Sequence, residues 1–334
     1  MIVVEDLEKV FKKPIRKPGI IGMFKTLFSR KYETKVAVNK INFTINEGEI
    51  VGYIGSNGAG KSTTIKMMCG ILNPTSGKVL INGIEPYKKR QTVAKQIGVV
   101  FGQKTQLWWD IPLIESFNVL KEIYLISDEE YKERFDFLQE VLDIKDFINQ
   151  PVRTLSLGQR MRADLAASLL HNPKILFLDE PTIGLDVLVK EKIRNAILMM
   201  NKKYNTTVIL TTHDMSDIEM LCNRIIMIEK GNIIYDGSLK DIKNKFGDLR
   251  TLNIQLDTTS INLDELKTFN DQVNYEFENG TLIAKFDAAK VSLDKVINEI
   301  LKKFTIKDMK IKELTIEDIA KEMYRKDEDE NKKE

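Results

Sequence analysis

The chain has 334 residues, of which 43% are hydrophobic and 30% are charged, and its formal net charge is +2. This composition is ordinary for a globular protein, and it lacks the basic excess expected of a nucleic-acid binder. Cys69 and Cys222 each fall in an apolar stretch that reads as helix, so we expect packing residues and no disulfide framework. The N-terminus lacks the basic and apolar regions of a signal peptide, and no segment approaches the ~20 apolar residues that cross a bilayer. These features predict a cytoplasmic protein.

Two β-rich runs, residues 1–11 and 35–45, open the chain, and a basic stretch rich in proline and glycine separates them over residues 12–31. We expect this stretch to be a loop-like insertion. It contains a short apolar patch, residues 20–28, that could touch a membrane surface or a partner. A local cap packed on its own domain is the simpler interpretation.

From residue 50 onward, short apolar strands alternate with helical stretches. This pattern predicts an α/β fold with a mainly parallel sheet that is covered on both faces by helices. Helical periodicity also predicts a subdomain of helices inserted at about 112–170. The strands are expected at 50–54, 97–101, 174–178 and 207–211, and a helix at 62–72.

The pattern changes after residue 247. The sequence Asn279-Gly280 predicts a tight hairpin turn within residues 273–286. A strand is expected at 249–256, a helix at 293–304 and a last helix from Ile316. The predicted organisation is a large domain over 1–242, a small α+β domain over 248–325 and a charged, solvated tail over 326–334.

A glycine-rich loop follows the strand expected at 50–54 and opens a helix, which is the context of a phosphate-binding loop. Its glycines let backbone N–H groups converge on phosphate oxygens, and the helix presents its positive end to the same anion. Lys61 should reach the β- and γ-phosphates of ATP, and Ser62 should ligate Mg²⁺. The predicted cofactors are therefore ATP and Mg²⁺. The predicted nucleotide-binding residues of this loop are Gly55, Ser56, Asn57, Gly58, Ala59, Gly60, Lys61, Ser62 and Thr63.

Two carboxylates, Asp179 and Glu180, end the apolar strand expected at 174–178. Parallel sheets place ligand-binding residues outside the carboxyl ends of their strands. We expect Asp179 to hold Mg²⁺ through water and Glu180 to act as general base on the attacking water. A pair of this kind can also cap the next helix, so its assignment depends on the phosphate-binding loop.

The stretch from Leu155 to Gln159 reads LSLGQ and precedes an apolar helix expected at 163–170. Alone it could be an ordinary Ser-capped helix start. A phosphate-binding loop, a glutamine, this stretch, a carboxylate-ended strand and a histidine follow one another along the chain. In this order the chain resembles the ATP-binding-cassette family, whose signature is LSGGQ. Leu157 replaces the usual central glycine, whereas Ser156 and Gly158 are kept.

The resemblance covers residues 1 to about 240. It implies a P-loop ATPase core with an antiparallel β subdomain and an inserted helical subdomain. It also implies a head-to-tail homodimer or heterodimer in which the phosphate-binding loop of one subunit and Ser156, Gly158 and Gln159 of the other enclose each ATP. The subunit would then lie on the inner face of the cell membrane, bound to a separate integral membrane permease.

Two more residues resemble family positions that act on the terminal phosphate. His213, after the strand at 207–211, matches the switch histidine that contacts the γ-phosphate and orients the attacking water. Gln103 matches the glutamine that senses Mg²⁺ and the γ-phosphate, and Gln106 is the alternative.

Further matches concern adenine and the second subunit. Tyr32 stands where the family commonly has an aromatic residue that stacks on adenine, unless it belongs to the basic insertion. Asp186 matches a loop that links the two sites of the dimer, although Gly184 stands where alanine is common.

The tryptophans Trp108 and Trp109 are adjacent, and either they dock a partner or one of them is buried in the core. Together with the C-terminal appendage and the IGLD loop, they resemble the exporter branch of the daunorubicin-resistance and sodium-export cassettes. The alternative function is a cassette ATPase that acts on nucleic acid or ribosomes. The chain has neither a second cassette nor a long coiled coil, so we expect export and no nucleic-acid partner.

Overall fold

The computed structural model describes residues 1–14, 32–102, 104–246, 249–258, 260–263, 266, 272–313, 318–319 and 323. The chain divides into two compact units, Met1–Gly237 and Ser238–Glu334. The large-domain limit expected at residue 242 therefore falls within the second unit.

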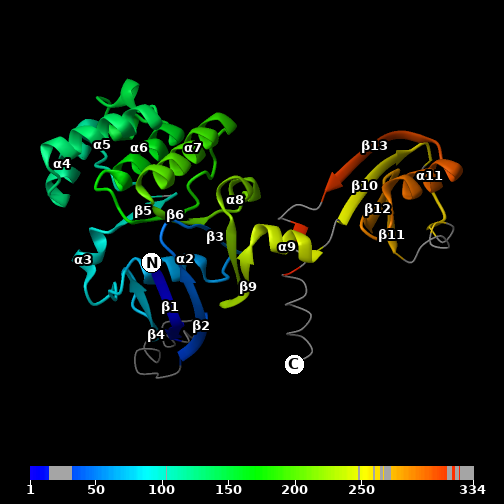
Figure 1. Ribbon diagram of the computed structural model, residues 1–334, viewed down its shortest axis with the longest axis horizontal. Coiled ribbons are helices and arrows are strands. Elements are labelled where there is room, and N and C mark those ends of the chain that lie inside the picture. The colour runs from blue at the N-terminus through cyan, green and yellow to red at the C-terminus, as the bar shows by residue number, and fades with distance from the viewer. Residues whose placement is uncertain are drawn as a thin grey trace, which may run out of the picture. The chain divides into compact units, whose positions relative to one another are not determined.

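The first unit is built on a six-stranded sheet with the order β5-β6-β7-β3-β8-β9 (Figure 1). The neighbours from β5 to β8 pair in parallel, as expected for an α/β fold. Lys230 and Gly231 both have positive φ and turn the chain from β8 into β9. The strands are β3 (Ile50–Gly55), β5 (Ile97–Phe101), β6 (Ile175–Asp179), β7 (Thr207–Thr211), β8 (Arg224–Glu229) and β9 (Asn232–Ser238).

An antiparallel sheet, β2-β1-β4, forms a second layer of this unit. Its strands β1 (Ile2–Pro14), β2 (Tyr32–Ile45) and β4 (Ser76–Ile81) pack with β3 and the helix α2 (Lys61–Met68) around one apolar core. The first two strands extend further than predicted, because backbone pairing continues through the polar residues up to Pro14 opposite Tyr32. The rest of the expected insertion, 15–31, lies outside the described residues.

Helices α4, α5 and α6 gather at the end of the unit away from the β2-β1-β4 sheet (Figure 1). Within the described ranges, no helix is both long and apolar enough to cross a membrane. Besides α2, the helices in the described part of this unit are α3 (Arg90–Ala94), α4 (Leu113–Tyr124), α5 (Asp128–Val141), η1 (Lys145–Phe147), η2 (Val152–Thr154), α6 (Leu157–Leu169), α7 (Val187–Tyr204) and α8 (Met215–Leu221).

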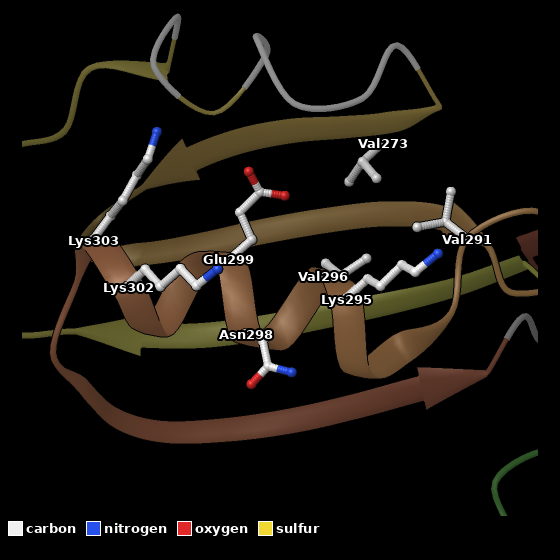
Figure 2. A pocket seen from close by; sticks show the side chains of 8 residues that line it. All are labelled: Val273, Val291, Lys295, Val296, Asn298, Glu299, Lys302 and Lys303. Atoms are coloured by element: carbon white, nitrogen blue, oxygen red, sulfur yellow. The ribbon is translucent and has the colours of Figure 1, made fainter.

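The second unit contains α9 (Leu239–Phe246) and an antiparallel sheet with the order β11-β12-β10-β13. The hairpin turns at Asn279 and Gly280, as predicted, and both have positive φ. A cavity of about 470 Å³ lies between α11 and β11, with Val273, Val291 and Val296 among its walls (Figure 2). The elements are β10 (Leu249–Leu256), β11 (Val273–Glu278), β12 (Thr281–Asp287), α11 (Leu293–Lys303) and β13 (Ile306–Glu313). Most of the helix expected from Ile316 and the tail 326–334 lie outside the described residues.

Candidate ATP-binding and hydrolysis site

The phosphate-binding loop connects β3 to α2, as the sequence predicts. Gly60 precedes the helix with a φ of 115°, and a Cβ placed there would lie 2.4 Å from the carbonyl oxygen of Ala37, so only glycine fits. The ammonium of Lys61 donates to the carbonyl oxygens of Gly55 (2.7 Å) and Ser56 (3.0 Å). Burial lowers the pKa of Lys61, although the carboxylates of Glu180 and Asp179 oppose the shift.

Oxygen atoms from three elements meet at the end of β6. The hydroxyl of Ser62 donates to Asp179 Oδ2 (3.3 Å), and the hydroxyl of Thr211 donates to Asp179 Oδ1 (2.6 Å). Thr211 can reach the carboxylate because it is the register partner of Asp179 across β6 and β7. A cavity of about 390 Å³ opens beside these atoms. A hydroxyl and a carboxylate are hard oxygen ligands of the kind that Mg²⁺ prefers.

Glu180 and His213 form a direct pair. Glu180 Oε1 lies 2.8 Å from His213 Nε2, and both side chains are partly exposed. Glu180 has a φ of 57°, which is uncommon outside glycine and costs on the order of 1–3 kcal/mol. Its N–H donates to the carbonyl oxygen of Thr211 (2.9 Å), which helps to hold this conformation. The structure thus brings together the two residues to which the sequence gives catalytic roles.

The segment after β5 connects the site to the helical subdomain. Gly102 donates its N–H to the carbonyl oxygen of Asp179 (2.8 Å). The predicted Mg²⁺ sensor Gln103 lies outside the described residues. Its alternative, Gln106, is bound to α6, because its N–H donates to Asp164 Oδ1 (3.0 Å) and its amide donates to the carbonyl oxygen of Asp164 (3.1 Å).

Asp164 is 5% exposed, and burial raises the pKa of this carboxyl to about 6, although hydrogen bonds from Gln106 and Thr105 oppose the shift. The folded protein therefore binds more protons than the unfolded chain between the ordinary pKa of aspartate and pH 6. The stability contributed by Asp164 is present at low pH and is lost as the pH rises through about 6.

We expect Asp164→Asn, which keeps an acceptor oxygen but cannot ionise, to gain stability over the wild type as the pH rises from about 4 to 7, by on the order of 2 kcal/mol. Urea unfolding at several pH values measures this difference. The exposed Asp146→Asn is the control and should follow the wild type. Parallel pH profiles for the wild type and Asp164→Asn would refute the prediction.

The signature residues form the first turn of α6, which begins at Leu157 rather than at the predicted residue 163. Ser156 Oγ accepts from the N–H of Gln159 (3.2 Å), and Gln159 Oε1 accepts from the N–H of Ser156 (2.9 Å). This reciprocal cap starts the helix early because it satisfies two end N–H groups. Asp186 caps α7 in a similar way, since Asp186 Oδ1 accepts from the N–H of Val189 (2.9 Å).

Leu157 and Gly184, which are the two departures from the family pattern, lie next to each other. A Cβ placed on Gly184 would lie 3.3 Å from Leu157 Cδ2, and one on Gly158 would lie 3.2 Å from Val189. The starts of α6 and α7 are therefore packed together, and Gly184 leaves room for the larger residue at position 157. Gly184 also has a φ of 71°, which favours glycine.

We expect Gly184→Ala to lower the free energy of unfolding by about 1–2 kcal/mol through backbone strain, with about 0.5 kcal/mol more from the contact with Leu157. Leu157→Ala in the same chain should remove only the second part. Gly83→Ala is the matched control, because Gly83 has a φ of 78° and open space at its Cβ position. Chemical unfolding of Gly184→Ala and Gly83→Ala, each with and without Leu157→Ala, measures these free energies. If Leu157→Ala recovered as much stability in Gly83→Ala as in Gly184→Ala, the account would be contradicted.

Trp108 and Trp109 are 40% and 47% exposed, so neither belongs to the core. They are anchored by the buried Leu107, and the guanidinium of Arg160 lies 5.6 Å from the ring centre of Trp109. Of the two interpretations left by the sequence, exposure favours a docking surface.

Tyr32 begins β2 and is 53% exposed. The part of β2 that touches the phosphate-binding loop is Ala37, beside Gly60. Five positions of strand correspond to about 16 Å, so the backbone of Tyr32 lies well away from this contact. Stacking of Tyr32 on adenine stays a prediction.

Several residues with contacts to the site are absent from the sequence prediction. Thr211 binds Asp179, and the buried Asp217 binds Thr182 and Thr212 beside the Glu180–His213 pair. The threonine-rich strand end at residues 211–212 could have indicated Thr211, whereas Asp217 has no such signal.

The chain is similar to known ATP-binding cassettes. The sequence model of the ABC transporter family matches residues 38–183. The chain is 33% identical to the ABC transporter ATP-binding protein NatA of Bacillus subtilis over 215 residues, which cover 64% of this chain and 87% of NatA. It is 30% identical over 317 residues to the cholesterol transporter ABCA5 of Rattus norvegicus, covering 91% of this chain but 19% of that transporter.

The structural comparison agrees. The dimeric post-hydrolysis structure of the ATP-binding cassette MJ0796 with ADP and Pi superposes with a TM-score of 0.60 at 27% identity, covering 72% of this chain and 99% of that one. With its P-loop, its carboxylate-ended β6 and its helical subdomain, this chain belongs to the ABC transporter family and is an ATP-hydrolysing ATPase of that family.

Proposed function

We propose that this chain drives export through a separate integral membrane permease, and that two ATPase subunits close head to tail around ATP. The observation that carries the dimer is the exposed start of α6. Ser156 is exposed there, and around it lie apolar side chains that are well exposed to solvent. These are Leu157, Ile183, Val187 and Leu188, at 38%, 42%, 77% and 72%. An exposed apolar patch at a polar site indicates a protein interface.

In the proposed site the backbone N–H groups after β3 and the ammonium of Lys61 bind the phosphates. Ser62 and Asp179, joined by Gln103, would hold Mg²⁺, which would supply charge stabilisation at the terminal phosphate. When nucleotide binds, a phosphate-binding side chain would give up its hydrogen bonds within the chain and bind the nucleotide. For Lys61 these partners are the carbonyl groups of Gly55 and Ser56.

Glu180 takes the proton from the attacking water, and His213 orients that water and contacts the γ-phosphate. Their 2.8 Å contact fixes the carboxylate relative to the imidazole before nucleotide closes the site. Ser156 and the N-terminus of α6 from the second subunit add donors to the γ-phosphate, so the site is complete in the dimer. Gly158, Gln159 and Asp186 belong to this shared surface.

The membrane partner is proposed to dock near Trp108 and Trp109, which would place the subunit on the inner face of the membrane. The pair is flanked by an ion pair between Arg153 and Asp110 (2.9 Å), so an apolar centre has a polar margin. The export direction is supported by the resemblance of this segment and of the C-terminal unit to exporter cassettes.

Sedimentation of Glu180→Gln tests the dimer. With ATP and Mg²⁺ the variant should sediment as a dimer, whereas with ADP it should be a monomer, because a hydrolysis-deficient site retains the γ-phosphate that joins the subunits. Glu180→Gln with Ser156→Arg is the control that should block closure. A monomer under every condition would overturn the proposed arrangement.

A further inference from the structure

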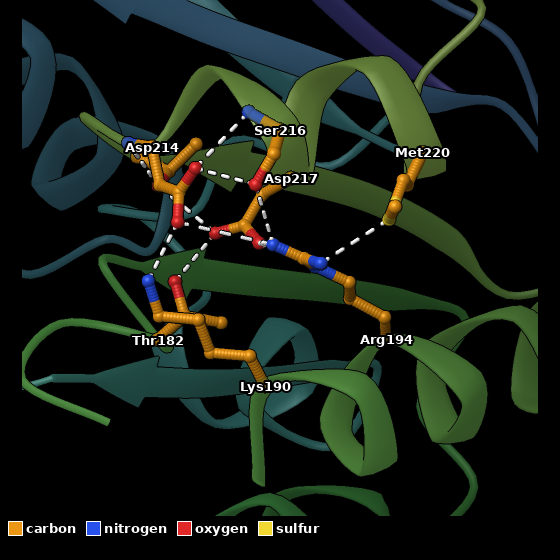
Figure 3. A network of polar contacts seen from close by, with 8 residues as sticks. Thr182, Lys190, Arg194, Asp214, Ser216, Asp217 and Met220 are labelled. Carbon is orange, nitrogen blue, oxygen red and sulfur yellow. Dashed lines mark hydrogen bonds and ion pairs between the residues drawn. The ribbon is translucent and has the colours of Figure 1, made fainter. Parts of the chain in front are cut away.

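A buried polar network lies directly behind the Glu180–His213 pair. Its centre is Asp217 in the first turns of α8, whose side chain is fully buried. Figure 3 shows this carboxylate between Thr182 and Arg194, with Asp214 and Ser216 beside it. A buried charge is stable only where it is paired and hydrogen-bonded, so the partners of this carboxylate must balance its charge and bind both of its oxygens.

One oxygen of Asp217 joins the two segments that carry the catalytic pair. Asp217 Oδ2 accepts from the hydroxyl of Thr182 (2.5 Å) and from the hydroxyl of Thr212 (3.1 Å). Thr182 lies two residues after Glu180, and Thr212 immediately precedes His213. The carboxylate therefore connects the backbone on both sides of the pair.

The other oxygen of Asp217 forms an ion pair with Arg194, which balances the charge of the carboxylate. Arg194 Nε of α7 donates to Asp217 Oδ1 (2.6 Å), and the Nη2 of the same guanidinium donates to Ser216 Oγ (2.7 Å). Around this pair, Lys190 donates to Asp214 Oδ2 (2.6 Å). Burial alone would raise the pKa of Asp214, but the bonds from Lys190 and Ser216 outweigh it and lower this pKa to about 2. Asp214 is therefore ionised at neutral pH.

The catalytic carboxylate needs such support. Glu180 is held at a φ of 57°, and a strained residue keeps its conformation only where its surroundings fix it. On one side the N–H of Glu180 is bound to Thr211. On the other side, the bond from Thr182 to Asp217 is the anchor, and the same carboxylate holds the start of the His213 segment.

We propose that Asp217 is a positioning residue for ATP hydrolysis. By binding Thr182 and Thr212 through one oxygen, it holds Glu180 and His213 in place relative to each other. This inference rests on the proposed roles of Glu180 and His213. The side chain of Asp217 is fully buried, so its loss should affect turnover and leave nucleotide affinity nearly unchanged.

The test uses Thr182→Val and Thr212→Val, which remove one hydroxyl each and keep the Asp217–Arg194 ion pair. Each should lower kcat about 3- to 10-fold with the KM for ATP changed less than about twofold. Because both bonds act through one oxygen, the double variant should be no slower than the slower single variant. Thr182→Ser, which keeps the hydroxyl, should recover kcat.

Thr207→Val is the matched control. Like Thr182 and Thr212, Thr207 is buried, but it lies at the start of β7, at the end of the strand away from His213. Its hydroxyl there accepts from the N–H of Gly48 (3.0 Å). It should lose stability and keep kcat. Losses that multiply in the double variant, failure of Thr182→Ser to recover kcat, or an unchanged kcat in Thr182→Val would overturn the inference alone. A wild type without Glu180-dependent turnover would overturn the proposed function and this inference with it.

Discussion

Glu180→Gln should lower kcat for ATP hydrolysis by about 10²- to 10⁴-fold, because glutamine cannot accept the proton of the attacking water. The substitution is isosteric, and its amide oxygen can still accept from His213, which lies 2.8 Å from Glu180 Oε1. The phosphate-binding loop is unaffected, so ATP should bind as tightly as to the wild type. Phosphate release at saturating ATP measures the first effect, and equilibrium binding of a fluorescent ATP analogue measures the second.

Glu191→Gln is the control for the loss of one carboxylate, because Glu191 is exposed on α7. It should keep the turnover of the wild type. Full turnover by Glu180→Gln would show that another group accepts the proton and that the contact with His213 is structural.

Asp217→Ala should lower the free energy of unfolding by about 3–5 kcal/mol, the largest stability effect that we expect in this chain. Arg194, which is 9% exposed, would remain buried with only the more distant carboxylate of Asp214, 3.8 Å from its Nη2. The hydroxyls of Thr182 and Thr212 would also lose their shared acceptor. Urea unfolding followed by circular dichroism measures the loss.

Two comparisons separate the buried charge from a general effect of removing a carboxylate. Glu5→Ala breaks an exposed ion pair with Lys78 (2.9 Å) and should change the free energy of unfolding little, because water and salt screen the pair. Arg194→Met combined with Asp217→Ala should recover most of the loss, because no unpaired charge then remains. A cost for Asp217→Ala as small as that of Glu5→Ala would contradict the assigned role of Arg194.

Local patterns made the centre of the fold predictable. Short apolar runs gave the limits of β5 and β7 without error, since buried parallel strands are apolar along their whole length. The loop around Lys61 and the carboxylates at the end of β6 could be placed because each lies at the end of such a strand.

The remaining features depend on contacts between residues far apart in the chain. Asp217 binds Thr182 and Arg194, 35 and 23 residues away, and nothing around Asp217 in the sequence marks it as buried. Leu157 and Gly184 are individually unusual, but only the fold shows that they touch. The early start of α6 did have a local signal, the Ser-x-x-Gln cap, which the apolar pattern after it obscured.

The most direct test of the central claim is ATP turnover by the purified wild type against enzyme concentration. If two subunits complete each site, the rate should rise more steeply than the enzyme concentration until the dimer is saturated, and Ser156→Arg should abolish this rise without weakening nucleotide binding. A rate strictly proportional to enzyme concentration, unchanged in Ser156→Arg, would mean that one chain hydrolyses ATP alone and that the start of α6 has no part in the site.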